Sequence, residues 1–198
     1  FYLCRYAMAY AFEYAMLYDL AMRLHRQSGS NTLGVFSFGA GSLLDAWSMA
    51  YARARLTLEE PAYEALKLYY KGVDEQLWDS YFVAPQRICP SDGRDEPSRA
   101  EQSPDFEKLW LCHSGIAEFL DRDILSRKDC RLYYETLVFP KIVNELKEED
   151  VEAIEERLGR VRLTYPVYYL LVSHSRYQLD RSGEILERFV RALDPEGR

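Results

Sequence analysis

Apolar and polar positions along the chain switch between two spacings, one typical of strands and one of amphipathic helices. Short, strongly apolar runs predict strands at Thr32–Phe38, Leu66–Asp74, Arg131–Pro140 and Tyr165–Ser175, and a strand or a turn near Leu109–Ser114. Helical spacing predicts helices at residues 43–55, 75–82, 144–161 and 182–193, and a short one after Ser114. This alternation favours a mostly parallel sheet with helices on both faces. We therefore expect an α/β fold, a three-layer αβα sandwich, formed by residues 1–198 as a single domain.

Two segments stand apart from this alternation. Residues 84–105 are rich in proline, serine and charge, and we expect a loop or an insertion there. Residues 1–30 precede the first predicted strand, and we expect them to form an N-terminal helical cap. The charged residues of this helix fall on one side at about 100° per residue, and they are Arg5, Glu13, Asp19 and Arg23. The rest is apolar or aromatic, so we expect most of the helix to be buried.

Tyrosines recur every four residues along this first helix, at Tyr2, Tyr6, Tyr10, Tyr14 and Tyr18. A tyrosine carries a ring that suits a core and a hydroxyl that requires a hydrogen-bond partner. Two interpretations follow. Either the rings pack in the core with their hydroxyls at the surface, or some of the hydroxyls line a wet pocket.

A glycine-rich turn follows the first predicted strand. Gly39-Ala40-Gly41 comes directly after Phe38, and the next helix begins with a capping-box pattern, because Asp45 lies three residues after Ser42. Ligands of parallel α/β sheets lie beyond the carboxyl ends of the strands. The residues expected at those ends, and therefore around one crevice, are Gly39–Ser42, Asp74, Ser114–Ile116 and Phe139–Lys141.

The turn does not suit a ligand that carries phosphates. The dinucleotide fingerprint needs a third glycine where this chain has Leu44, and Asp45 puts a carboxylate where pyrophosphate would bind. No Gly-Lys-Ser/Thr sequence follows, which excludes a P-loop. S-adenosylmethionine is a cationic ligand without phosphates, and Asp74, at the end of the second strand, can accept hydrogen bonds from both hydroxyls of its ribose. Gly72-Val73-Asp74 also suits an ordinary turn.

Two of these stretches together resemble a known family. "VFSFGAGSLLDAW" followed by "YYKGVD" is similar to the first two motifs of class I S-adenosylmethionine-dependent methyltransferases, which have a Rossmann-like fold. "LVFPKIVNEL" and "YYLLVSHSR" resemble the fourth and fifth strands of that fold, so the resemblance covers residues 33–198.

The resemblance implies a set of cofactor-binding residues. The backbone of Phe38, Gly39, Ala40 and Gly41 would lie against the methionine part, with Asp45 beside it. Asp74 would bind the ribose hydroxyls and Glu75 would approach the adenine. Ser114, Gly115 and Ile116 would flank the adenine, and Phe139, Pro140 and Lys141 would face the methyl group and its acceptor.

The chain also departs from the family pattern. Ser37 stands where the family usually has an acidic residue, and Ser114 where its adenine loop often has an aspartate. No Asn-Pro-Pro-Tyr motif is present. These departures keep open an alternative, a catalytically inactive methyltransferase-like scaffold that acts as a binding module. No catalytic residue is identified, and the candidates for a base are Glu135, Lys141, His174, Tyr10 and Tyr14. Tyr10 and Tyr14 would belong to a helix that covers the cofactor.

Composition narrows the partners. The net charge is −7, with no long run of Lys or Arg, so a small molecule or a protein is favoured over nucleic acid as the methyl acceptor. No apolar run reaches the roughly 18 residues of a membrane span. The four cysteines have no CxxC spacing and no paired-histidine motif, so we expect no metal site and reduced thiols in a cytoplasmic protein. "GAGS" is not the GxSxG elbow of a hydrolase. A nucleotide-binding Rossmann enzyme remains a third possibility.

Overall fold

A central sheet organises the structure, a computed structural model that describes residues 2–89, 96–97, 104–139, 145–163, 168–171 and 176–195. Over these residues the sheet has seven strands in the order β4-β3-β5-β2-β1-β7-β9. Their bounds are β1 Thr32–Phe38, β2 Lys67–Asp74, β3 Arg87–Cys89, β4 Glu96–Pro97, β5 Lys108–His113, β7 Thr136–Phe139 and β9 Tyr168–Leu171. All neighbours pair in parallel except β3 and β4. The predicted, mostly parallel sheet is confirmed.

Strand β1 lies at the centre because its residues are apolar on both faces. Six of its seven residues are buried, as expected for a strand covered by helices on both sides. It pairs with β2 from Thr32↔Lys67 to Phe38↔Val73 and with β7 from Val35↔Thr136. The next strand along the chain, β2, pairs with one edge of β1, and β7 pairs with the other edge. The order of strands therefore reverses beside β1, which is where open α/β sheets form their crevice.

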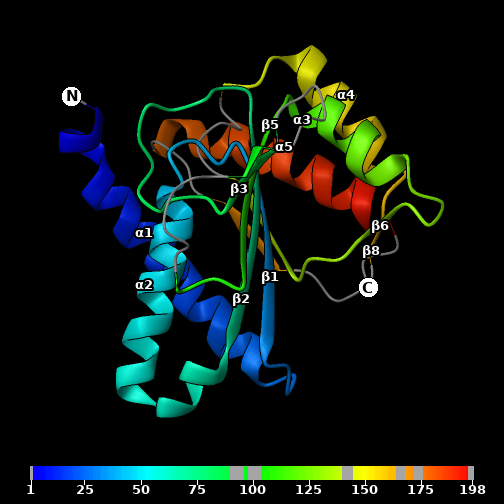
Figure 1. The fold of residues 1–198 in the computed structure, drawn as a ribbon. Helices are drawn as coiled ribbons and strands as arrows, with labels where there is room; N and C mark the ends of the chain where they lie inside the picture. Colours follow the sequence, from blue (N-terminus) through cyan, green and yellow to red (C-terminus); the bar gives the residue numbers. More distant parts are fainter. Residues whose placement is uncertain are drawn as a thin grey trace.

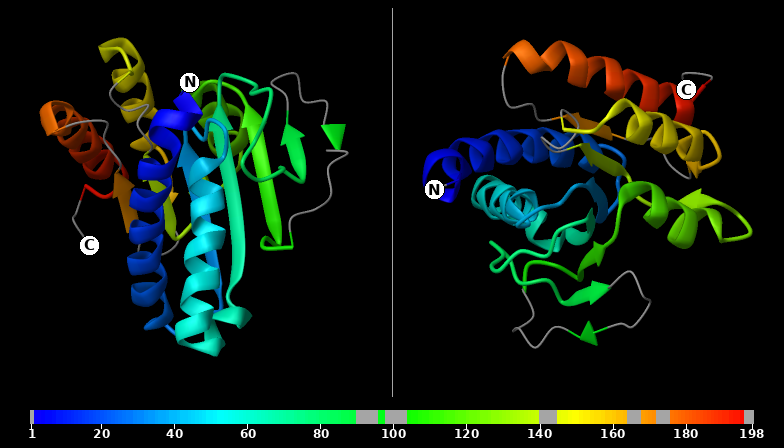
Figure 2. Two further views of the ribbon diagram at one scale, coloured as in Figure 1. Left: turned by 90° about the vertical axis from the view of Figure 1, so that its left-hand side faces the viewer. Right: turned by 90° about the horizontal axis from the view of Figure 1, so that it is seen from above.

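Helices cover both faces of the sheet (Figure 1). Helices α1 (Tyr2–Arg26) and α2 (Leu44–Glu59) lie on one face, and α3 (Ile116–Phe119), α4 (Glu148–Leu158) and α5 (Arg176–Leu193) lie on the other, as the two further views also show (Figure 2). Short segments η1 (Pro61–Ala65) and η2 (Leu120–Leu125) follow α2 and α3. Two apolar clusters, one on each face, form the core. The α/β architecture is compatible with a Rossmann-like fold.

Helix α1 is buried on one side only, which contradicts the expectation that most of it is buried. Tyr10, Tyr14 and Tyr18 face the core. The opposite side exposes an apolar stripe with a spacing of four residues, made of Met8, Phe12, Met16, Leu20 and Leu24. A spacing of four brings residues onto one face of a helix, but it does not say whether that face finds a partner. None of the described helices is sufficiently long and apolar to cross a lipid bilayer.

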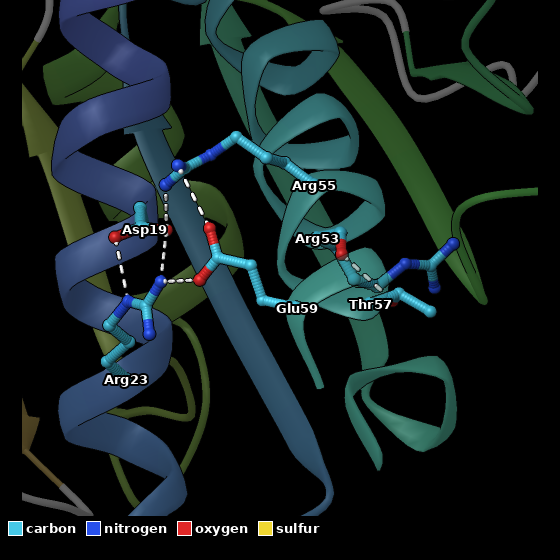
Figure 3. A network of polar contacts seen from close by, with 6 residues as sticks. All are labelled: Asp19, Arg23, Arg53, Arg55, Thr57 and Glu59. Carbon is cyan, nitrogen blue, oxygen red and sulfur yellow. Dashed lines mark hydrogen bonds and ion pairs between the residues drawn. The ribbon is translucent and has the colours of Figure 1, made fainter. Parts of the chain in front are cut away.

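Charged residues fasten α1 to α2 along their outer surface (Figure 3). Asp19 on α1 accepts a hydrogen bond from Arg23 Nε at 3.0 Å and pairs with Arg55 of α2. Glu59 of α2 pairs with Arg23 and with Arg55 Nη1, the latter at 3.3 Å. The four side chains form a closed network, so each charge has two partners of opposite sign. Such a network fixes the register of the two helices more than it stabilises them, because three of its four side chains are solvent-exposed.

Three local predictions were wrong. Residues 75–82, expected to be helical, form an irregular segment. The single strand expected at Arg131–Pro140 is divided into β6 (Arg131–Leu132), which pairs with β8 (Arg162–Leu163), and β7. Helix α2 begins at Leu44 with no side-chain cap, so Ser42 and Asp45 do not form a capping box. The segment 84–105 was expected to be a loop or an insertion, and its described residues contribute β3 and β4 to the sheet.

Candidate functional site

The turn between β1 and α2 is held against the end of β2 by its own backbone. The N–H groups of Gly39 and Ala40 both donate to Val73 O, at 2.8 and 3.0 Å. Gly39 and Gly41 have φ values of 81° and 53°, in the region that favours glycine. Leu43 also has a positive φ of 61°. The left-handed backbone brings the chain sharply from the strand into the helix and leaves the turn at the carboxyl end of the sheet.

A close approach at Gly72 makes this geometry possible. A Cβ atom on Gly72 would lie 2.4 Å from Ala40 Cβ, closer than two carbon atoms can come. The middle residue of the turn therefore rests directly on the backbone of β2. Glycine is required at position 72 for this contact, not for a turn of its own, because β2 continues through it to Asp74.

Asp74 joins the end of β2 to the turn. Its Oδ2 accepts a hydrogen bond from the Gly41 N–H at 2.7 Å, and its Oδ1 accepts one from the Gln76 N–H at 2.8 Å. Burial raises the pKa of Asp74, while the two backbone N–H groups act in the opposite direction. Each carboxylate oxygen accepts two hydrogen bonds. Asp74 can therefore hold the turn and still accept two further donors from a ligand.

Asp45 brings a second carboxylate to the same place from the first turn of α2. It is 2% exposed, and both its oxygens lie within hydrogen-bond distance of the Tyr70 hydroxyl, at 2.8 and 2.9 Å. Burial raises the pKa of Asp45 to about 6, and the neighbouring hydroxyls of Ser37 and Tyr70 limit that rise. The carboxylate lies next to Ser37, the position at which the resembled family has its acid.

These residues line a cavity of about 710 Å³. Its walls come from the ends of β1, β2 and β5, from the start of α2 and from α4. Tyr10 and Tyr14 of α1 close one side, and Trp78 lies over the turn, 3.7 Å from the place of a Cβ on Gly41. A volume between roughly 300 and 1,000 Å³ is usual for a small-molecule site. The crevice expected at the carboxyl end of the sheet is therefore present.

The cavity brings together most of the residues that the sequence singled out. Those that line it are Gly39, Ala40, Gly41, Asp45, Asp74, Glu75, Gly115 and Ile116. The side chains of Phe38 and Phe139 do not line it; they stack in the core with ring centroids 4.7 Å apart. The Ser114 hydroxyl donates to Glu118 Oε2 at 2.9 Å, and Ser114 is buried behind the wall. Pro140, Lys141 and His174 lie outside the described residues.

Glu135 is not part of this site. Its Oε2 accepts a hydrogen bond from the Gly34 N–H at 2.7 Å, near the amino end of β1 and therefore at the opposite end of the sheet. It lines a separate hollow of about 350 Å³. Of the candidate bases in the described residues, only Tyr10 and Tyr14 line the main cavity.

Sequence reasoning missed several residues of the cavity wall. Gln76 and Trp78 belong to the segment expected to be helical, which instead folds back so that the Phe82 N–H donates to Ser42 O at 2.9 Å. Asp150 and Ile154 come from α4, and the Asp150 carboxylate accepts a hydrogen bond from the Lys147 N–H at 3.3 Å. The one signal in the sequence was the group of aromatic residues shortly after Asp74. Loops that follow strands often carry binding residues, so these aromatic residues could have been assigned to the site.

The cavity wall is acidic. The described lining residues include carboxylates at Asp45, Asp74, Glu75, Glu118, Glu145 and Asp150, and they include no Lys, Arg or His. This charge favours a cationic ligand and opposes a phosphate. Within the described part of the chain, no three His, Cys, Asp or Glu side chains are grouped so that they could hold a metal ion.

Two comparisons with known proteins find no relative of this chain. No protein-family model matches the chain. A search of curated proteins finds no similar sequence either.

Proposed function

We propose that the cavity binds S-adenosylmethionine and that the protein transfers its methyl group to an acceptor, a small molecule or a protein rather than nucleic acid. The observation that carries this proposal is the position of Asp74. Its carboxylate ends the strand next to the glycine turn and lines the same cavity as that turn. A carboxylate in this place suits the two hydroxyls of a ribose.

The surrounding residues fit the other parts of the same ligand. The turn Gly39-Ala40-Gly41 offers backbone without large side chains, which allows the methionine part to lie close to it. The Asp45 carboxylate lies beside Ser37 and supplies from α2 the negative charge that the resembled family carries on its first strand. Glu75 and the backbone of Gly115 are neighbours, because a Cβ on Gly115 would lie 3.0 Å from Glu75 Oε1. They form the place for the adenine.

The chemistry requires little more than alignment. The sulfonium supplies an activated methyl group with a good leaving group, so the protein mainly positions the two reactants and excludes water. Tyr10 and Tyr14, at 7% and 5% exposure, are the side chains of α1 that would cover the reacting groups. A base is needed only for an acceptor that must lose a proton.

A titration calorimetry experiment tests the cofactor. Wild-type protein is titrated with S-adenosylmethionine and with S-adenosylhomocysteine, and micromolar binding is expected. Asp74→Ala removes two charge-assisted hydrogen bonds to the ribose and is expected to weaken binding about 100-fold or more. Asp180→Ala, an exposed aspartate on α5, is the matched control and should bind as the wild type does. Because Asp74 also holds the Gly41 N–H, thermal unfolding must show that Asp74→Ala is folded.

The results separate three functions. Absence of binding to either compound by folded wild-type protein contradicts the proposal. Binding without methylation of any acceptor favours the inactive scaffold, for which Ser37 and Ser114 at normally acidic positions already argue. Binding of NAD in the absence of any binding of the adenosyl compounds would instead support a nucleotide-dependent enzyme.

A further inference from the structure

Two cysteines lie side by side on neighbouring strands, on the face of the sheet opposite α1 and α2. Cys89 of β3 and Cys112 of β5 are register partners in a parallel pair. Register partners on adjacent strands are about 4.8 Å apart, and disulfides span Cα distances of roughly 4.4–6.8 Å. Cys112 belongs to the core cluster beneath α3, α4 and α5, and Cys89 is packed against that cluster. The backbone therefore already holds the two thiols at a distance that a disulfide can bridge.

The two thiols differ in their access to solvent. Cys112 is 1% exposed, whereas Cys89 is only half-buried and is the more accessible of the pair. A reagent from solvent can reach Cys89, and Cys112 can react only with what Cys89 has become. In a stepwise oxidation Cys89 would therefore react first with the reagent, and Cys112 would react second, with the modified Cys89.

Two cations, Lys71 and Arg87, and one carboxylate, Asp123, lie near the pair. Lys71 of β2 is 7% exposed, with its Nζ 4.7 Å from the centroid of the Phe119 ring and 3.5 Å from Asp123 Oδ1. Arg87 lies two residues before Cys89 on the same strand. The hydrogen bond with the Cys112 thiol, together with Arg87 and Lys71, lowers the pKa of Cys89. The same hydrogen bond, together with burial, raises the pKa of Cys112. Cys89, the more exposed of the two, is therefore the thiol that ionises more readily.

These cations also argue against a metal site. A metal ion next to Lys71 and Arg87 would be repelled, and the described residues provide no third ligand at the pair. A thiolate in a cationic environment is instead the arrangement of a reactive, oxidisable cysteine.

We propose that Cys89 and Cys112 form a redox-active dithiol, which a hydroperoxide oxidises to a disulfide, with Cys89 as the attacking sulfur and Cys112 as the resolving sulfur. The Cys89 thiolate attacks the terminal oxygen of the hydroperoxide. The O–O bond breaks, the alcohol or water leaves with a proton, and Cys89 becomes a sulfenic acid. The Cys112 sulfur then attacks the Cys89 sulfur, the S–O bond breaks and water leaves. The two thiols lose two electrons, and the peroxide gains them.

Lys71 supports the second step as well as the first. Once Cys89 is a neutral sulfenic acid, the Lys71 ammonium no longer faces a Cys89 thiolate, and its charge favours loss of the proton from Cys112. The proposal uses residues outside the cavity and does not depend on the proposed methyl transfer. A reducing thiol such as dithiothreitol is expected to restore the starting state.

The test uses the reduced full chain, hydrogen peroxide as oxidant at pH 7, and alkylation of the remaining thiols before peptide mass spectrometry. We expect a Cys89–Cys112 cross-link, with Cys130 still alkylated, and recovery of both thiols with dithiothreitol. In the same molecule, iodoacetamide should modify Cys89 about tenfold faster than Cys130, because Cys89 lies beside the cations Lys71 and Arg87, which favour its reactive thiolate form. Cys130→Ser is the matched control and should leave the cross-link unchanged.

Single variants assign the order of the steps. In Cys112→Ser, dimedone should trap a sulfenic acid on Cys89, and in Cys89→Ser, Cys112 should stay reduced. A cross-link to another cysteine, a sulfenic acid that appears first on Cys112, or equal alkylation rates at Cys89 and Cys130 would each overturn the proposal. The comparison within wild-type protein decides the matter even if a variant fails to fold.

Discussion

Substitution of Gly72 by alanine is the most direct test of how the site is built. The new Cβ would lie 2.4 Å from Ala40 Cβ, whereas carbon atoms in contact are about 3.5–4.0 Å apart. The turn would therefore have to move away from β2 by more than about 1 Å. The hydrogen bonds from Gly39 and Ala40 to Val73 O, at 2.8 and 3.0 Å, cannot survive that movement intact.

The expected loss of stability follows from these two effects. Overpacking of this kind costs about 1–3 kcal/mol, and weakened backbone hydrogen bonds add about 1 kcal/mol. We expect Gly72→Ala to lower the free energy of unfolding by about 3 kcal/mol, which corresponds to a fall in Tm of about 6–12 °C. Binding of S-adenosylhomocysteine should weaken as well, because the displaced turn is the proposed contact for the methionine part.

Equilibrium unfolding in urea measures the effect, and two further variants control it. Gly183→Ala lies in α5 with no atom within 4 Å of the new Cβ, so it should stabilise the helix by about 0.5–1 kcal/mol. Ala40→Gly in the Gly72→Ala background removes the shortest contact and leaves Tyr70 Cε1 at 3.1 Å and Leu111 Cδ1 at 3.4 Å. The double variant should regain at least about 1 kcal/mol over Gly72→Ala. Wild-type stability of Gly72→Ala, or no recovery in the double variant, would refute the argument.

Three further predictions follow from buried polar groups. The pKa of Asp45 is raised to about 6 in the folded protein. Between about pH 4 and pH 6 the folded protein therefore binds a proton that the unfolded chain does not. The free energy of unfolding should fall as the pH rises through this range. Asp45→Asn should abolish this part of the pH dependence and raise the free energy of unfolding at pH 7 by up to about 3 kcal/mol relative to wild type, measured from urea midpoints across pH. It should also weaken binding of S-adenosylhomocysteine if the proposed site is correct. Tyr18→Phe removes a buried hydroxyl that has no hydrogen-bond partner among the described residues. It should raise the free energy of unfolding by about 1 kcal/mol in thermal melts, and a loss of stability would show that the hydroxyl is paired. Glu135→Ala leaves the Gly34 N–H without its acceptor and should lower the free energy of unfolding by about 1–2 kcal/mol. The affinity for the proposed ligand S-adenosylhomocysteine should stay unchanged in calorimetry, because Glu135 lies at the opposite end of the sheet.

The parts of the fold that the sequence predicts are those decided by local pattern. The strand at Thr32–Phe38 is an apolar run that ends at a glycine, and the structure has it with the same bounds. The turn after it and Asp74 were placed at one edge by the general rule for parallel sheets, and both line the cavity. A continuous apolar run and a glycine are properties of neighbouring residues, so they can be interpreted without the rest of the chain.

The features that were missed depend on contacts between distant segments. Residues 75–82 have helical spacing, but the bond from the Phe82 N–H to Ser42 O draws them over the turn as irregular chain. The role of Gly72 became visible only with Ala40 placed against it. The exposure of Phe12 on α1 could not be inferred from its apolar character, because periodicity places a residue on a face and does not supply a partner for that face.

The central position of β1 has a consequence for synthesis on the ribosome. After β1 emerges from the ribosome, β2 follows soon and can pair with one edge of β1. The other edge can pair only after β7, which begins at Thr136, has been synthesised. At about 5–20 residues per second, the intervening stretch takes roughly 5–20 s to translate. Throughout that interval the nascent chain presents an apolar strand with unpaired amide groups to its surroundings. We therefore expect it to engage chaperones that shield such strands until translation passes β7.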